Sequence, residues 1–175
     1  FHDHDPRVLD RVLDDARIAK VLLTRNPLDS YVSRKIASAT GQWRLTDLKD
    51  AKTGKITFDE LEFTQMLDDW SGFRNTLRRG LQATGQTLFP IRYEDINDVE
   101  VLNGLAAFLG SEHRLSAASR RLKRQNPGKI EDKVANVRDM TAALARIDRF
   151  GLERITDGEV PRPAGASGFV AHPFA

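Results

Sequence analysis

The residues that could do chemistry are concentrated at one junction, where an apolar run ends in Arg25 and is followed at once by Asn26 and Pro27. Asn26 is expected to cap a helix that begins at Pro27, and the start of a helix offers free N–H groups and a partial positive charge. Arg25 adds a fixed cation with paired N–H donors. Ser30 and Ser33, three residues apart, add hydroxyls on one helical face. The junction therefore predicts a cradle for an anion such as phosphate.

A purely structural interpretation of the same junction stays open. Asn-Pro pairs are common at helix starts, and Arg25 could pair with Asp29 or Asp95 on the surface. Asp29 would in any case sit in the first turn, where a negative charge favours the helix dipole.

The elements that must position this junction alternate between strands and helices. The apolar run 19–24 predicts a strand buried on both faces, and residues 87–95 predict a second strand that Pro90 places at an edge or a bulge. Helices are predicted over residues 6–16, 27–39, 58–83, 99–109, 116–122 and 137–150. This alternation indicates an α/β protein with a parallel sheet. Two strands cannot complete such a sheet, so we expect further strands before Phe1.

Composition narrows the classes of protein. The chain has 175 residues, a net charge of +2 and no cysteine, which excludes disulfides, thiolate metal sites and a cysteine nucleophile. The small net charge gives no indication of a nucleic-acid partner, and no apolar run approaches the roughly 20 residues of a transmembrane helix. With no signal-peptide pattern either, we expect a cytoplasmic protein with one domain over residues 1–155 and a Pro/Gly-rich tail over residues 156–175.

The segment TRNPLDSYVSRKIA, residues 24–37, resembles the 3'-phosphate-binding segment of sulfotransferases that use PAPS (3'-phosphoadenosine-5'-phosphosulfate). In that family a strand ends in Arg-Asn/Asp-Pro, and a serine follows eight positions after the arginine; here these residues are Arg25 and Ser33. ATGQW, residues 39–43, and IRYEDI, residues 91–96, are similar to segments of bacterial carbohydrate and glycolipid sulfotransferases of the trehalose and nodulation-factor type. The likeness covers most of the chain.

The resemblance implies a P-loop-like sulfotransferase fold with a parallel sheet and a mostly helical C-terminal part. Family members hold the 5'-phosphosulfate in a turn after their first strand, typically Arg-Ser-Gly-Ser/Thr, and this sequence has no such turn. The Gly-Lys pair in AKTGKIT, residues 51–57, lacks the preceding strand and the earlier glycine of a P-loop. We therefore expect the missing strands and the 5'-phosphosulfate loop to lie before Phe1, and this fragment alone to be inactive.

The catalytic base is expected near the start of the chain, where residues 2–5 read HDHD. His2 falls where cytosolic family members carry a histidine, so His2 or His4 could take the proton of the acceptor hydroxyl. A glutamate upstream of Phe1, as implied for the trehalose type, and a purely structural loop histidine are the alternatives. No metal is expected, because sulfuryl transfer needs none and two strong ligands rarely hold one.

Two further groups of residues are candidates for binding. Lys123, Arg124 and Lys129 lie in the basic stretch RRLKRQNPGKIEDK, where the resemblance implies a loop closed over the nucleotide; a solvated helix end is the alternative. Gln42 and Trp43 could line an acceptor site, because a sugar face stacks on an indole. Trp43 could equally anchor its loop to the core.

The resemblance implies transfer of a sulfuryl group from PAPS to a hydroxyl of a carbohydrate or glycolipid, with 3',5'-ADP as the product. Arg25, Ser33 and Ser30 would hold the cofactor. Two other classes stay open: a P-loop-type, kinase-like nucleotide enzyme, and a non-catalytic nucleotide-binding remnant of the fold. We expect a second copy of the chain, or the missing N-terminal segment, to cover the exposed sheet edge.

Overall fold

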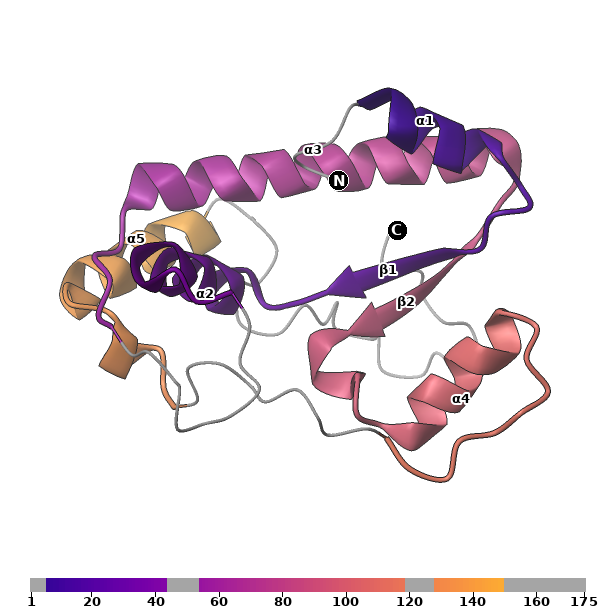
Figure 1. Cartoon of the computed structure of the whole chain (residues 1–175). Coiled ribbons are helices and arrows are strands. Elements are labelled where there is room, and N and C mark those ends of the chain that lie inside the picture. The colour runs from indigo at the N-terminus through magenta and orange to yellow at the C-terminus, as the bar shows by residue number, and fades with distance from the viewer. Residues whose placement is uncertain (1–5, 44–53, 119–127, 150–175) are drawn as a thin grey trace, which may run out of the picture.

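The structure is a computed structural model that describes residues 6–43, 54–118 and 128–149 (Figure 1). Its elements, in chain order, are α1 (Pro6–Asp14), β1 (Lys20–Thr24), α2 (Pro27–Thr40), α3 (Glu60–Thr84), β2 (Leu88–Arg92), α4 (Val99–Phe108) and α5 (Val137–Arg149), with 3-10 turns at Tyr93–Asp95 and Glu131–Lys133. The chain is thus mixed α/β, as predicted. Residues 116–118, predicted to begin a helix, are not helical.

The two strands pair in parallel, with a register that runs from Lys20 beside Leu88 to Thr24 beside Arg92. The chain crosses from β1 to β2 through α2 and α3. Figure 1 shows α3 along one side of the strands and α4 on the other. Pro90 lies within β2, which has one neighbouring strand in the described part of the chain. An edge position of this kind tolerates the missing N–H of proline, as the sequence predicted.

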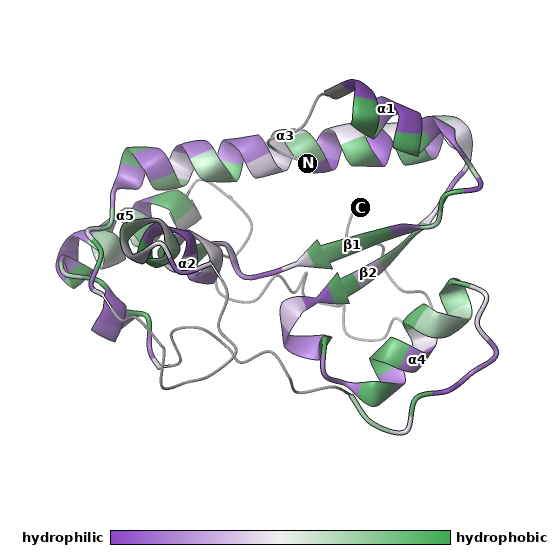
Figure 2. Ribbon diagram, viewed as in Figure 1, coloured by the Kyte–Doolittle hydropathy of each residue, from purple (hydrophilic) through white to green (hydrophobic). Residues whose placement is uncertain are grey.

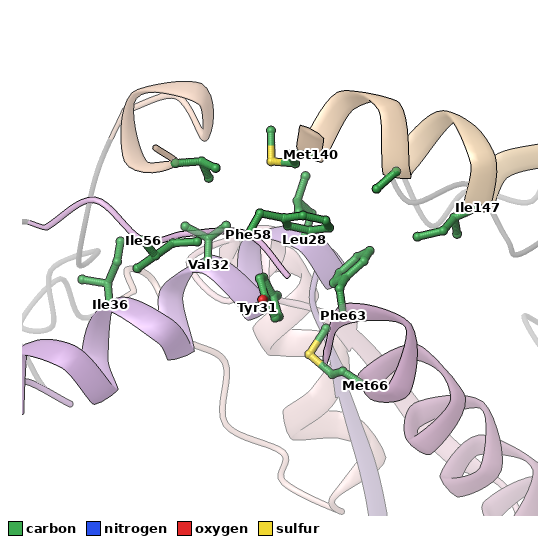
Figure 3. Close-up of a cluster of buried hydrophobic side chains, with 12 residues drawn as sticks. Leu28, Tyr31, Val32, Ile36, Ile56, Phe58, Phe63, Met66, Met140 and Ile147 are labelled. Atoms are coloured by element: carbon green, nitrogen blue, oxygen red, sulfur yellow. The ribbon is translucent and has the colours of Figure 1, made fainter. Parts of the chain in front are cut away.

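A large hydrophobic cluster, which we call the first core, joins α2, the first turns of α3 and α5 (Figure 3). Its buried members are Leu28, Tyr31, Val32, Ile36, Ile56, Phe58, Phe63, Met66, Val134, Met140, Ala143 and Ile147. Tyr31 and Phe63 are fully enclosed, and their rings meet edge to face with centroids 5.3 Å apart. Such aromatic contacts add to the stabilisation from buried area.

Two asparagines fasten non-helical segments through paired hydrogen bonds to the backbone. The side chain of Asn136 accepts from the Phe58 amide at 2.8 Å and donates to the Phe58 carbonyl at 2.9 Å. The buried side chain of Asn103 in α4 likewise accepts from the Leu115 amide at 2.7 Å and donates to the Leu115 carbonyl at 3.1 Å. Each asparagine thereby satisfies the backbone N–H and C=O groups of a residue that lies outside the helices and strands.

A smaller cluster, the second core, joins α1, the last turns of α3 and β2. Its buried members are Leu13, Leu77, Leu81 and Leu88. Gly80 lets α1 approach α3 closely, because a Cβ at that position would lie only 2.7 Å from Cδ1 of Leu13. Leu22 and Phe73 are partly buried against this cluster.

The prediction that β1 is buried on both faces is wrong for the described structure. Leu22 packs toward the second core, but Val21 and Leu23 on the opposite face are 44% and 56% exposed. On that face α4 packs against β2, where Phe89 contacts Phe108 with ring centroids 5.6 Å apart. Figure 2 shows green, hydrophobic residues in both strands, with hydrophilic residues at the start of β1 and the end of β2. The apolar run therefore indicates that both faces of β1 could be buried. The described residues cover only one of these faces.

Candidate anion-binding site

The predicted junction lies at the carboxyl edge of the strand pair. Because β1 and β2 are parallel and Thr24 is opposite Arg92, the residues that follow, Arg25 and Tyr93, leave the sheet side by side. In open parallel sheets the carboxyl ends of the strands are where ligands bind. The backbone thus brings a cation and an aromatic ring to the expected edge.

Arg25 is held by this ring. The central carbon of its guanidinium lies 4.5 Å from the centroid of the Tyr93 ring. Its Nε is buried and has no hydrogen-bond partner among the described residues. A buried donor of this kind is costly to leave unsatisfied, and Arg25 therefore has an N–H whose hydrogen bond the described residues do not supply.

The start of α2 is less open to an anion than the sequence suggested. Oδ1 of Asn26 accepts from the amides of Leu28 at 2.9 Å and Asp29 at 3.1 Å, and the carbonyl of Asn26 accepts from the Ser30 amide at 3.0 Å. Pro27 has no N–H. The expectation that helix N–H groups form part of the cradle is therefore wrong, because the cap already uses them. Anion binding here would rest on side chains and on the helix dipole.

The two serines supply side-chain donors of the required kind. Ser30 and Ser33 are both half-buried on α2, one turn apart. Each hydroxyl has one proton to donate and can rotate toward an acceptor. The hydrogen bonds of the Asn26 cap do not use these two hydroxyls.

The candidate acceptor residues lie at the other end of α2. Gly41, at φ 68°, ends the helix, and Gln42 and Trp43 follow it. A 14-residue helix is about 21 Å long at about 1.5 Å per residue, so the structure separates Trp43 from Arg25 by roughly that length. The indole is 64% exposed, so the alternative that Trp43 anchors its loop in the core is wrong.

The remaining candidates divide by location. His2, His4, Lys123 and Arg124 lie outside the described residues. Lys129 is exposed, beside Gly128, whose φ of 103° marks a turn. Among the described residues, no group of three or more His, Asp or Glu side chains is placed to hold a metal ion.

A second polar cluster ties α2 to α3. The hydroxyl of Tyr31 accepts from the Asp59 amide at 3.1 Å and lies 3.3 Å from Glu62, to which Lys35 donates at 2.5 Å. Burial raises the pKa of Tyr31, and the hydrogen bond to Glu62 raises the pKa of Lys35. All of these groups have partners, which fits a structural connection between the helices.

A buried lysine lies at the opposite end of β1 from Arg25. Nζ of Lys20 donates to the carbonyl of Asp15 at 2.6 Å and to the side chain of Gln86, which in turn donates to the carbonyl of Leu13. This network fastens the end of α1 to the turn before β2. The ammonium group of Lys20 is hydrogen-bonded to carbonyl oxygens, so we interpret this lysine as a structural residue.

Tyr93 is the neighbour of Arg25 that the sequence interpretation missed. Its segment, IRYEDI, was recognised, but no role in the junction was given to the ring. The signal was present in the two strand ends, because parallel pairing in this register brings the residue after β1 beside the residue after β2.

Within the described residues, no helix is both long enough and apolar enough to cross a membrane. Comparison with protein-family models gave no match, and neither a curated protein nor a solved structure matched the chain.

Proposed function

We propose that this chain is part of a PAPS-dependent sulfotransferase and that Arg25 binds the 3'-phosphate of the cofactor. The observation that carries the proposal is the guanidinium of Arg25 at the carboxyl edge of β1, with a buried Nε that lacks a partner in the described structure. The eight-residue spacing to Ser33 and the Tyr-Glu-Asp segment after β2 support the same family.

In the proposed reaction, an oxygen of the acceptor hydroxyl bonds to the sulfur of PAPS while the bond from sulfur to the bridging phosphate oxygen breaks. The hydroxyl proton passes to a base, and 3',5'-ADP leaves with the electron pair of the broken bond. Arg25 and Ser33 would act by fixing the position of the donor, which lowers the entropic part of the barrier. As in phosphoryl transfer, the protein mainly supplies placement and charge.

The proposed acceptor is a hydroxyl of a carbohydrate or glycolipid. Support comes from the ATGQW segment and from the exposed indole of Trp43, on which a sugar face can stack. Because α2 separates Trp43 from Arg25, the indole would contact a part of the acceptor remote from the 3'-phosphate.

Discrimination between two nucleotides tests the proposal. A charge-assisted hydrogen bond contributes about 1.5–3 kcal/mol, so the protein should bind 3',5'-ADP on the order of tenfold to a hundredfold better than 5'-AMP in titration calorimetry. Arg25→Ala should remove most of this preference, and Ser33→Ala should reduce it less because a neutral hydroxyl donates one bond. Arg34→Ala, which removes an exposed charge from the same helix, is the matched control and should leave the preference intact.

Equal affinity of the wild-type protein for the two nucleotides would remove the sulfotransferase proposal. A preference that survives in Arg25→Ala would place the 3'-phosphate elsewhere.

A further inference from the structure

The helix α3 carries charges of opposite sign in its two halves. Residues 60–69 contain acidic side chains and no basic ones, namely Glu60, Glu62, Asp68 and Asp69. Residues 74–84 contain basic side chains and no acidic ones, namely Arg74, Arg78 and Arg79. The helix dipole favours charges of these signs only in the first and last turns, so it does not account for Asp68 or Arg79.

A row of exposed residues follows the outer face of α3, the helix that runs along one side of the molecule in Figure 1. At alternating spacings of four and three, the row consists of Leu61, Gln65, Asp68, Gly72, Asn75, Arg79 and Gln82. This spacing keeps residues on one face of a helix and matches the repeat by which two helices stay in contact along their length. The buried residues of α3 lie on the opposite face, so the row is open to a partner.

Two charged side chains of this row, Asp68 and Arg79, have no ion-pair partner among the residues that the structure describes. The acidic residues at the start of α3 differ, because Glu60 is paired with Arg146 and Glu62 with Lys35. Residues pair along a helix when they are three or four positions apart. Asp68 and Arg79 are too far apart to neutralise each other within one copy of the helix.

Gly72 is the central residue of α3, which runs from Glu60 to Thr84. Glycine is less favourable than alanine inside a helix, and here a Cβ would meet nothing within 4 Å. Gly80 of the same helix has a visible reason, because a Cβ there would lie 2.7 Å from Cδ1 of Leu13 in α1. No described neighbour supplies a comparable reason for Gly72, although a glycine would allow a second helix to approach closely.

We propose that the outer face of α3 binds the same face of a second copy of this chain, with the two helices antiparallel. If the two-fold axis passes between Gly72 and Asn75, Asp68 lies opposite Arg79 of the partner subunit. The symmetry repeats this ion pair on the other side of the axis. The acidic half of each helix then meets the basic half of the other, whereas a parallel arrangement would bring like charges together. The inference does not depend on the proposed function.

The area of the contact indicates a weak dimer. A helix of 25 residues is about 38 Å long and about 10 Å wide, so one helix pair buries less than the roughly 1,200 Å² at which stable interfaces begin. We expect a dissociation constant on the order of 0.1 mM at low salt.

Reversal and exchange of the two charges test the proposal. Sedimentation velocity from about 10 μM to about 1 mM protein gives the dissociation constants. Asp68→Arg and Arg79→Asp each replace two attractive contacts by repulsive ones and should weaken the dimer at least about tenfold. The double variant, in which the charges are exchanged, should recover to within about threefold of wild type. Glu112→Arg, in the exposed segment after α4, is the matched control and should leave the dimer unchanged.

A wild-type chain that stays monomeric at about 1 mM would overturn the proposal. A dimer that both single reversals leave unchanged would overturn it too, because the interface would lie elsewhere, for example at the strand edge. So would a double variant that associates no better than the single ones.

Gly72→Ala tests the close approach at the axis, because its two expected effects have opposite directions. The alanine should raise the melting temperature of the dilute monomer by a few degrees, since it favours the helix. Its methyl group should also hold the two helices apart and weaken the dimer severalfold. A variant that associates as tightly as wild type would overturn the placement of the axis beside Gly72.

Discussion

The two cores share the helix α3, but they are enclosed to different degrees. Around the first turns of α3, side chains such as Tyr31 and Phe63 are fully buried among three helices. Around its last turns, four leucines form the second core, and the strand pair beside them exposes Val21 and Leu23. The candidate anion site lies at the edge of this less enclosed strand pair. The comparison indicates that the helical part supplies most of the stability, whereas the site proposed here lies at the less enclosed strand edge.

The largest expected effect compares two phenylalanines on the same helix. Phe63→Ala should lower the free energy of unfolding by about 3–5 kcal/mol, because it leaves a cavity in a fully enclosed site. Phe73→Ala, in a half-buried position beside the second core, should cost about 1–2 kcal/mol, since only part of the ring is removed from water. Denaturant unfolding followed by circular dichroism measures both. Equal costs would contradict the difference in enclosure.

A smaller effect is expected from the same polar substitution in the two regions. Val32→Thr places a hydroxyl in the first core, where Val32 is 2% exposed, and should cost about 1–3 kcal/mol. Val21→Thr introduces the hydroxyl on the exposed face of β1 and should change the stability by less than about 0.5 kcal/mol. Chemical denaturation of the two variants is the measurement. A marked destabilisation by Val21→Thr would show that this face is covered in solution.

The smallest expected effect depends on pH and concerns the surface of the first core. Arg146 of α5 donates to Glu60 at the start of α3 in a two-pronged ion pair, which lowers the pKa of Glu60. A lowered pKa in the folded state contributes stability above the ordinary pKa of glutamate, and the contribution is lost as the pH falls through the lowered value. Glu60→Gln should therefore melt slightly lower than wild type near neutral pH.

The two melting temperatures should converge in acid, and differential scanning calorimetry across the acidic range would follow this. Asp68→Asn, on an exposed part of the same helix, serves as the control. A difference between wild type and Glu60→Gln that stays constant as the pH falls would exclude the ion pair as its cause.

Local signals in the sequence predicted the elements well. The Asn26–Pro27 pair fixed the start of α2, and the apolar stripe identified α3 within two residues at its start and one at its end. The same local reasoning failed where the outcome depends on neighbours. The apolar composition of β1 indicates which faces could be buried. Whether they are buried depends on how the other elements pack, and in the structure Val21 stays exposed.

The arrangement of the candidate site could be predicted only in part, for the same reason. Arg25 and the serines follow from the order of residues along one segment, whereas the contact with Tyr93 depends on pairing between distant strands. The error about the helix N–H groups was avoidable from sequence. An asparagine recognised as a cap consumes the same amides that an anion would need, so capping and anion binding at one helix start compete.

The grip of Asn136 on Phe58 has a consequence for synthesis of the chain. This contact joins residues that are 78 positions apart in the sequence. The buried leucines of the second core, in contrast, have all been synthesised once the chain reaches Leu88. At about ten residues per second, the ribosome needs about six seconds to extend the chain from Leu88 to Ile147. During that interval the rings of Tyr31 and Phe63 have no α5 to cover them. The part of the molecule that is best enclosed in the native state is therefore the part that waits longest during synthesis for its last element.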